Sequence, residues 1–297
     1  MDYKSGFVSI VGRPNVGKST ILNAFIKEKV AITSFRPQTT RNAIRGILTT
    51  SDAQIIFIDT PGIHNPKSKL GEFMLSSAVE NIGGVDVVLV VVEATSESNI
   101  KEDEKIIERV KTSNLPAILA INKVDLIDKQ NVLPLIDRYS KMMKFHSVVP
   151  ISAKKSDNLD AVISDVKTIL KPGPKFFPED EITDQPERVI VSEIIREKVL
   201  KNIQDEIPHG IGVEIISFKE REDKNLIEIQ ANVYCEKDTH KAIIIGKQGK
   251  MLKKIGSQAR LDIESFLKTK IFLEIWVKVK QDWRNNNFML KSLGLKK

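Results

Sequence analysis

Cysteine is almost absent from this chain, with Cys235 the only one among 297 residues. A single thiol cannot form an internal disulfide, which excludes the disulfide-rich folds of small secreted proteins and favours a reducing cytosol. Long apolar runs are absent too, since none approaches the roughly 18–20 residues that a membrane-spanning helix needs. The most apolar stretch, 85–94, contains Asp86 and Glu93 and predicts a buried strand. The first expected strand, 7–11, begins so early that we expect no signal peptide.

Acidic residues are scarce in one region of the sequence. Residues 241–297 contain 14 Lys and Arg but only 4 Asp and Glu, a net charge of +10, whereas the whole chain carries +7. A basic end on a slightly acidic body indicates that this region contacts a polyanion. A solvated lysine-rich surface is the alternative that charge alone leaves open. The hydrophobic content of 41% is typical of a soluble globular protein, and the length allows two domains.

Residues 1–170 alternate short apolar runs with amphipathic stretches. The apolar runs predict strands at 7–11, 44–50, 54–58, 85–92, 117–121 and 147–151. The amphipathic stretches predict helices at 19–26, 70–81, 101–111, 132–143 and 158–170. Strands that are apolar on both faces are typical of a parallel sheet with helices on both sides. We therefore predict a doubly wound α/β domain.

A second, smaller domain is expected after a proline-rich stretch. Residues 171–187 hold four of the twelve prolines and are interpreted as a semi-extended linker. The pattern over 188–297 then predicts helix, strand, strand, helix, helix and strand, in that order. The first of these helices is indicated by apolar residues at a spacing of four, Ile195, Val199, Ile203 and Ile207. This order predicts an α+β domain with one half-solvated sheet.

Residues 12–19 read GRPNVGKS and match the phosphate-binding pattern G-x-x-x-x-G-K-[ST] between an expected strand and an expected helix. The glycines let the backbone curl so that its N–H groups point at phosphate oxygens. Lys18 supplies a positive charge to the β- and γ-phosphates, and Ser19 offers its hydroxyl to Mg²⁺. An ordinary glycine-rich turn is the alternative for this motif alone. The residues expected to contact the nucleotide here are Asn15, Val16, Gly17, Lys18, Ser19 and Thr20.

Three further motifs each follow an expected strand. DTPG provides Asp59, which can hold Mg²⁺ through water, and Gly62, whose N–H can meet the γ-phosphate. NKVD provides Asp125, whose carboxylate can accept two hydrogen bonds from a donor pair that guanine has and adenine lacks. SAK provides a backbone N–H for the guanine O6. The four motifs in this order predict GTP binding, with further contacts from Asn122, Lys123, Asp125, Ser152, Ala153 and Lys154.

These motifs resemble those of the translation-factor-like GTPases, and of the Era family among them. The shared sequences are GRPNVGKS, PQTTR, DTPGI, NKVD and SAK. The resemblance implies that Thr40 is the switch threonine that coordinates Mg²⁺ beside Ser19 and Asp59, with Thr39 as the alternative. It also implies that 33–41 and 63–75 are switches ordered by the γ-phosphate. Slow intrinsic turnover is expected, with catalytic roles for Asn15, Lys18, Thr40 and Gly62.

The residue after DTPG is Ile63, where many small GTPases have a glutamine that orients the attacking water. Isoleucine cannot hydrogen-bond water, so hydrolysis must be arranged differently. In related GTPases an asparagine at the place of Asn15 coordinates K⁺, which puts a positive charge where an arginine finger would otherwise act. The alternative is that Asn15 simply fits the turn, and both interpretations stay open.

A G-x-x-G loop, IIGKQGK, lies between two expected helices in the basic region. In KH domains this loop brings backbone and basic residues against the phosphates of about four nucleotides. A simple helix-connecting turn is the alternative, but the element order and the charge favour a KH domain of type II. Lys254 lies one helical turn beyond the loop together with Lys253. The predicted RNA contacts are Gly246, Lys247, Gln248, Gly249, Lys250 and Lys253.

The resemblance to the Era family spans essentially the whole chain and includes SEIIREK, EIPHG and VKVKQDWRNN, with Gly210 replacing a common serine. It implies a P-loop GTPase domain followed by a KH domain, binding near the 3′ end of 16S rRNA, and a role in maturation of the small (30S) ribosomal subunit. A cytoplasmic monomer is expected, and peripheral attachment at the inner face of the cell membrane stays open. Trp276 and Trp283 either stack on bases or pack in the domain.

Three other classes of protein fit less well. A tRNA-modification GTPase would need a reactive cysteine near its C-terminus, and no cysteine follows Cys235. A septum or membrane-remodelling GTPase would need an amphipathic or coiled-coil extension, which the sequence does not show. An RNA-binding protein with an inactive nucleotide domain is disfavoured by the intact Lys18, Ser19, Asp59 and Asp125.

Overall fold

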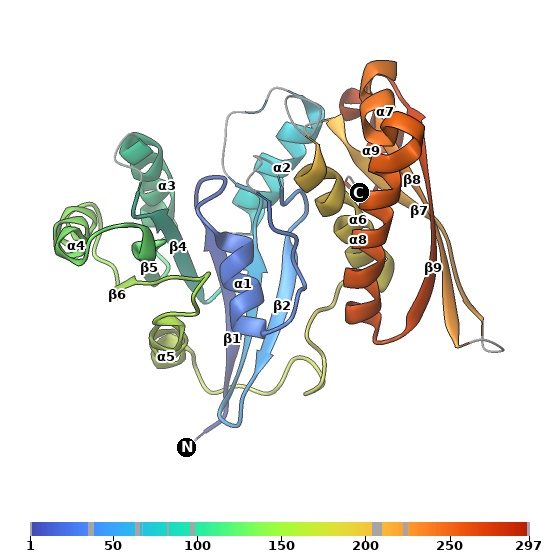
Figure 1. Ribbon diagram of the computed structural model, residues 1–297. Coiled ribbons are helices and arrows are strands. Elements are labelled where there is room, and N and C mark those ends of the chain that lie inside the picture. The colour runs from blue at the N-terminus through green and yellow to red at the C-terminus, as the bar shows by residue number, and fades with distance from the viewer. Residues whose placement is uncertain are drawn as a thin grey trace. The chain divides into compact units, whose positions relative to one another are not determined.

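The computed structural model describes residues 2–34, 39–62, 66, 68–81, 83–95, 99–203, 210–221 and 225–295. The chain forms two compact units (Figure 1). The first unit comprises residues 1–31, 40–65 and 74–184, and the second comprises 32–39, 66–73 and 185–297. The expected switches thus contribute residues to both units, with the change of unit falling between Thr39 and Thr40.

The first unit is built on a six-stranded sheet with the order β2-β3-β1-β4-β5-β6. Its strands are β1 (Lys4–Val11), β2 (Ile44–Thr49), β3 (Ala53–Asp59), β4 (Val87–Glu93), β5 (Ala117–Asn122) and β6 (Ser147–Pro150). All neighbours are parallel except β2 and β3. These two strands are joined by a tight turn closed by Thr50 N and Ala53 O at 2.8 Å, too short for a parallel crossover. The sheet is therefore mixed, not wholly parallel as the apolar runs suggested.

Helices cover both faces of this sheet, which confirms the doubly wound α/β prediction. They are α1 (Lys18–Ile26), α3 (Ile100–Thr112), α4 (Val132–Ser140) and α5 (Leu159–Ile169), whereas α2 (Lys69–Glu80) is divided between the two units. On one face, α1 and α5 bury Phe25 and Val162 against strand residues such as Leu89. On the other face, α3 and α4 pack Ile107 and Tyr139 with the alternate strand residues. Period-2 alternation within each strand feeds both apolar clusters.

Most of the predicted linker is attached to the first unit. Residues 171–184 belong to that unit and run beside its sheet. The side chain of Gln54, which has no exposed surface, accepts from the N–H groups of Phe176 and Phe177 and donates to the Phe177 carbonyl. Further along, Ile47 N donates to Ile182 O at 2.9 Å. Pro172 makes one isolated bridge to Lys4 of β1, and the buried amide of Gln54 holds the segment further along.

The second unit has the predicted order of elements, helix, strand, strand, helix, helix, strand. They are α6 (Glu187–Asn202), β7 (Gly212–Arg221), β8 (Leu226–Cys235), α7 (Asp238–Ile245), α8 (Lys250–Leu267) and β9 (Lys270–Val279), followed by the short α9 (Asn287–Ser292). The sheet order is β7-β8-β9, with β7 antiparallel and β9 parallel to β8. The apolar stripes of α6 and α8 pack on this sheet through residues such as Ile195 and Ile263.

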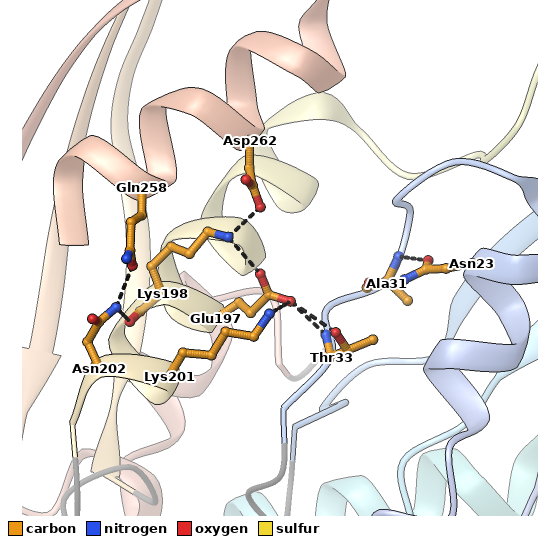
Figure 2. A network of polar contacts seen from close by, with 9 residues as sticks. All are labelled: Asn23, Ala31, Thr33, Glu197, Lys198, Lys201, Asn202, Gln258 and Asp262. Carbon is orange, nitrogen blue, oxygen red and sulfur yellow. Dashed lines mark hydrogen bonds and ion pairs between the residues drawn. The ribbon is translucent and has the colours of Figure 1, made fainter. Parts of the chain in front are cut away.

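A buried charge network joins α6 to α8 in the second unit (Figure 2). Glu197 has no exposed surface and lies 3.3 Å from Lys198 Nζ and 3.1 Å from Lys201 Nζ. Lys198 also pairs with Asp262 of α8, and Glu197 accepts from the N–H of Thr33 at 2.9 Å. Each buried charge therefore has a partner, which is the condition for burying it at tolerable cost.

The two tryptophans differ in their surroundings. Trp283 is fully buried and donates from Nε1 to Gly210 O at 2.8 Å, so the idea that it stacks on a base is wrong. Trp276 of β9 is 43% exposed. Only Trp276 keeps an accessible ring face.

Candidate nucleotide and nucleic-acid sites

The four predicted nucleotide motifs meet at one edge of the sheet. The phosphate loop follows β1, Asp59 ends β3, Asn122 ends β5, and Ser152 lies just beyond β6. Because these strands are parallel, their carboxyl ends lie on the same side. In doubly wound sheets this edge is where ligands bind.

The phosphate loop has a shape that only particular residues allow. Gly17 has φ = 105°, and a Cβ there would lie 2.2 Å from Nδ2 of Asn122. Without that Cβ, Asn122 comes close enough to donate to Val16 O at 2.8 Å, and it also accepts from Ala153 N at 3.0 Å. One buried amide therefore joins the phosphate loop to the NKVD and SAK motifs. Asn15 is exposed with φ = 66°, a left-handed conformation that asparagine tolerates.

Lys18 lies at the floor of the loop. Its Nζ donates to the carbonyls of Arg13 at 2.9 Å and Gly12 at 3.1 Å, and the residue is 6% exposed. Burial lowers the pKa of Lys18 to about 8, even though Asp59 favours the charged form. The ammonium group is thus held in place and only partly compensated, which suits it to bind an added anion.

Three oxygen atoms converge beside this lysine. Ser19 Oγ lies 2.6 Å from Asp59 Oδ2 and 2.9 Å from Thr40 Oγ1, and Thr40 Oγ1 lies 3.2 Å from Asp59 Oδ2. Asp59 has no exposed surface, and burial raises the pKa of its carboxyl. Within the described part of the chain, its Oδ1 has no hydrogen-bond partner. Buried oxygens around an unmet carboxylate oxygen fit a hard divalent cation such as Mg²⁺. The geometry also favours Thr40 over Thr39 for this role.

The base-recognition residues lie together at the other end of the site. Ser152 Oγ donates to Asp125 Oδ1 at 2.7 Å, and this hydrogen bond lowers the pKa of Asp125. Asp125 is therefore an acceptor at neutral pH. Lys123 lies beside it and pairs with Glu93 at 2.9 Å, whereas Lys154 is exposed.

The remaining predicted site residues either lie beside the phosphate loop or are outside the described residues. Thr20 follows Ser19 in the first turn of α1. Gly62 lies against the loop, since a Cβ there would be 2.8 Å from Pro14 N. Ile63 and the adjoining expected switch residues 64, 65 and 67 lie outside the described residues, as do 35–38.

The G-x-x-G loop lies where α7 meets α8. Gly246 and Gly249 have φ values of 72° and 74°, and a Cβ on Gly246 would be 2.7 Å from Met251 Cβ. Lys247 and Lys250 are both exposed. The loop leads into the N-terminus of α8, whose N–H groups add attraction for phosphate.

A groove of about 420 Å³ continues from this loop between α8 and β9. It is lined by Gly249, Leu252, Lys253, Gly256, Ser257, Arg260, Leu273 and Ile275. Arg260 was not among the RNA contacts predicted from the sequence. It lies seven residues after Lys253, a spacing that places both on one face of the helix. Basic groups on one wall and apolar groups from β9 on the other suit a chain with phosphates and flat bases.

Two protein families match separate parts of the chain. Residues 7–123 match the family described as 50S ribosome-binding GTPase, and residues 206–284 match the KH domain. The GTPase Era of Ruminiclostridium cellulolyticum is 58% identical over 296 residues, covering 100% of this chain and 99% of that protein. The GTPase Era of a Thermoanaerobacter species is 52% identical, covering 99% and 97%. The chain belongs to the Era family of GTPases.

Solved Era structures share the whole fold. The structure of a single-residue variant of Aquifex aeolicus Era bound to GDP·AlF₄⁻ has a TM-score of 0.95 at 40% identity, covering 99% of this chain and 100% of that one. An Era structure in complex with MgGDPNP and nucleotides 1506–1542 of 16S ribosomal RNA has a TM-score of 0.95 at 41% identity, with the same coverage. These likenesses confirm the family resemblance and the fold class that the motifs predicted.

The pKa of Lys18 leads to a test of phosphate binding. A bound phosphate favours the charged lysine, so the affinity for GDP should be full below about pH 8 and fall as the pH rises above it. At pH 8.5, binding should therefore be accompanied by proton uptake, because part of the free protein then carries neutral Lys18. Calorimetry in two buffers of different ionisation enthalpy measures this uptake. Lys111→Ala, at an exposed lysine of α3 outside the nucleotide motifs, should retain it; no uptake at pH 8.5 in the unmodified protein would contradict the assignment.

Proposed function

We propose that this protein is a GTP-hydrolysing switch that binds 16S rRNA near its 3′ end and assists assembly of the small ribosomal subunit. The convergence of Ser19, Thr40 and Asp59 beside Lys18 carries the nucleotide half of this proposal. The groove beside the G-x-x-G loop carries the RNA half. A relative of the same fold is complexed with both MgGDPNP and 16S rRNA nucleotides, which supports combining the two.

Guanine nucleotides fit the site better than adenine nucleotides. The Asp125 carboxylate stays ionised and is held by Ser152, so it can accept from the two adjacent donors of guanine. Adenine offers no such pair, and a site built for a hydrogen bond strongly rejects an analogue that lacks it. Asn122 would keep this recognition site in fixed register with the phosphate loop.

The phosphate end of the site fits a magnesium-dependent hydrolysis. Ser19 and Thr40 would hold Mg²⁺ directly and Asp59 through water; when bound, the metal neutralises charge on the β- and γ-phosphates. Lys18 adds a fixed positive charge from the loop floor. Thr40 and the Gly62 N–H would sense the γ-phosphate, so that its loss releases the segments that they belong to. Turnover is slow because Ile63 cannot orient water.

A monovalent cation beside Asn15 would supply the positive charge that an arginine finger supplies in other GTPases. Asn15 is exposed at the loop and carries an amide oxygen suited to K⁺. GTP turnover should be faster in K⁺ than in Na⁺ at equal ionic strength, because Na⁺ is smaller and gives up its water less readily. Phosphate release under multiple turnover measures both rates. Asn15→Ala should remove the difference, and equal rates in the two salts would refute this role.

The second unit would bind single-stranded RNA in the groove between α8 and β9. The loop from Gly246 to Gly249 and the exposed Lys247 and Lys250 would contact phosphates, with Gln248 at the turn. Lys253 and Arg260 would continue this contact along α8. The apolar floor formed by Leu273 and Ile275 gives bases a surface to lie on.

Reversing the loop charges tests the RNA half alone. Lys247→Glu with Lys250→Glu should abolish binding of a 3′-end 16S rRNA oligonucleotide, because the clamp becomes repulsive. Basal GTP hydrolysis should stay unchanged. Lys219→Glu with Lys278→Glu changes the net charge equally at exposed sheet positions away from the groove and should weaken binding only slightly. RNA affinity is measured by fluorescence anisotropy. If the two pairs of substitutions weakened it equally, the loss would be a nonspecific effect of charge and the groove would have no special role.

The cellular setting follows from the same proposal. A cytoplasmic monomer that meets the small subunit there is the simplest arrangement. None of the helices within the described ranges combines the length and apolar character that crossing a bilayer requires. Peripheral attachment at the inner face of the cell membrane is the alternative setting.

A further inference from the structure

A buried ion pair with a residue outside the phosphate loop holds Arg13, the second residue of that loop. The side chain of Arg13 is only 7% exposed, and its Nε donates to Asp103 Oδ1 at 2.7 Å. Asp103 lies in α3 and is 1% exposed. The two residues are 90 positions apart, and none of the four nucleotide motifs contains Asp103.

A tyrosine from a third element completes this arrangement. Tyr139 of α4 is 1% exposed and donates its hydroxyl to Asp103 Oδ2 at 3.0 Å. Burial raises the pKa of the Asp103 carboxyl, and the Arg13 guanidinium opposes that shift. The pKa of Tyr139 is raised by burial and by Asp103, so its hydroxyl stays a donor. Arg13, Asp103 and Tyr139 are hereafter the loop anchor.

The loop anchor reaches the nucleotide site through the backbone of Arg13. The carbonyl of Arg13 accepts from Lys18 Nζ at 2.9 Å, and the neighbouring Gly12 carbonyl accepts from the same atom at 3.1 Å. The side chain of Arg13 is thus tied to α3 and α4 while its backbone holds the phosphate-binding lysine. Close-packed interiors transmit small displacements, so a change at Asp103 should move this carbonyl.

We propose that Asp103 and Tyr139 are positioning residues for the GTP site, which fix the phosphate loop and Lys18 through Arg13. This role rests on the proposed function as a GTP-binding protein. It goes beyond general stabilisation because it concerns the β-phosphate contacts specifically. The guanine-binding end is held by Asn122 and Ser152, and Asn122 meets the phosphate loop at the Val16 carbonyl, whereas the loop anchor holds it at Arg13.

The test compares nucleotides that differ by one phosphate or by the base. In Asp103→Asn, the ratio of GDP affinity to GMP affinity should fall by about 10- to 100-fold, the range for losing a charge-assisted hydrogen bond. In Tyr139→Phe the fall should be about two- to tenfold, as for a neutral one. The preference for GDP over ADP should stay unchanged in both. Affinities are measured by calorimetry at 25 °C in Mg²⁺, on full-length protein shown to be folded.

Matched controls lie on the same two helices. Glu108→Gln in α3 and Asp137→Asn in α4 each remove an exposed ion-pair carboxylate, with 67% of each side chain exposed. Both should leave the GDP-to-GMP ratio as it is. Arg13→Met combined with Asp103→Leu, made in the Tyr139→Phe background so that no buried hydroxyl is left without an acceptor, replaces the buried pair by apolar groups, which generally preserves folding. This triple variant should fold yet still show the reduced ratio, so the test stands even if Asp103→Asn fails to fold.

Two results would overturn the role of the loop anchor. One is an unchanged GDP-to-GMP ratio in folded Tyr139→Phe and in the triple variant. The other is an equal loss of phosphate and base discrimination, which marks a general structural effect. Failure of the unmodified protein to prefer GDP over GMP or ADP would instead refute the proposed GTP site.

Discussion

The carboxylate of Asp59 is the constraint on which the nucleotide site depends. It has no exposed surface and accepts from Ser19 and Thr40 through Oδ2 alone. Its Oδ1 meets no donor in the parts of the chain that the structure describes. An anion buried in this way is costly unless a cation completes it. Burial accordingly raises the pKa of Asp59, while the neighbouring Lys18 opposes the shift and has its own pKa lowered. The protein alone therefore leaves both charges incompletely satisfied, and a magnesium–nucleotide complex would relieve them.

The fold makes this arrangement by bringing loops to one sheet edge and then joining them with buried polar groups. Asn122 joins the phosphate loop to the SAK motif, which fixes the distance between phosphate and base recognition. The Arg13 and Asp103 pair joins the same loop to α3. The side chains of both links, Asn122 and the Arg13–Asp103 pair, are almost fully buried. These links are therefore more rigid than contacts at the surface. Because Gly17 has no side chain, Asn122 can approach the phosphate loop.

Much of this was predictable from the sequence because each motif carries local information. The phosphate loop, the strand-end carboxylates and the element order of the second unit depend on short patterns, and all appear as expected. Pairings distant in sequence were not predictable: the attachment of 171–184 through Gln54 and the pair of Arg13 with Asp103 have no local signature. The antiparallel β2 was missed because apolar runs do not reveal strand direction. Trp283 is buried and therefore packs in the domain. The sequence alone could not distinguish this packing from stacking on a base.

Whether Asp59 is a buried charge that awaits a cation is tested most directly by the stability of Asp59→Asn, measured by urea unfolding with and without Mg²⁺ and GDP. The variant should be more stable than the unmodified protein when both ligands are absent, because a buried unmet charge is gone. In the variant Mg²⁺ should add little to the stabilisation by GDP, whereas it should add much in the unmodified protein. A variant that is less stable without ligands, or that keeps the full Mg²⁺-dependent gain, would show that Asp59 does not carry such a charge.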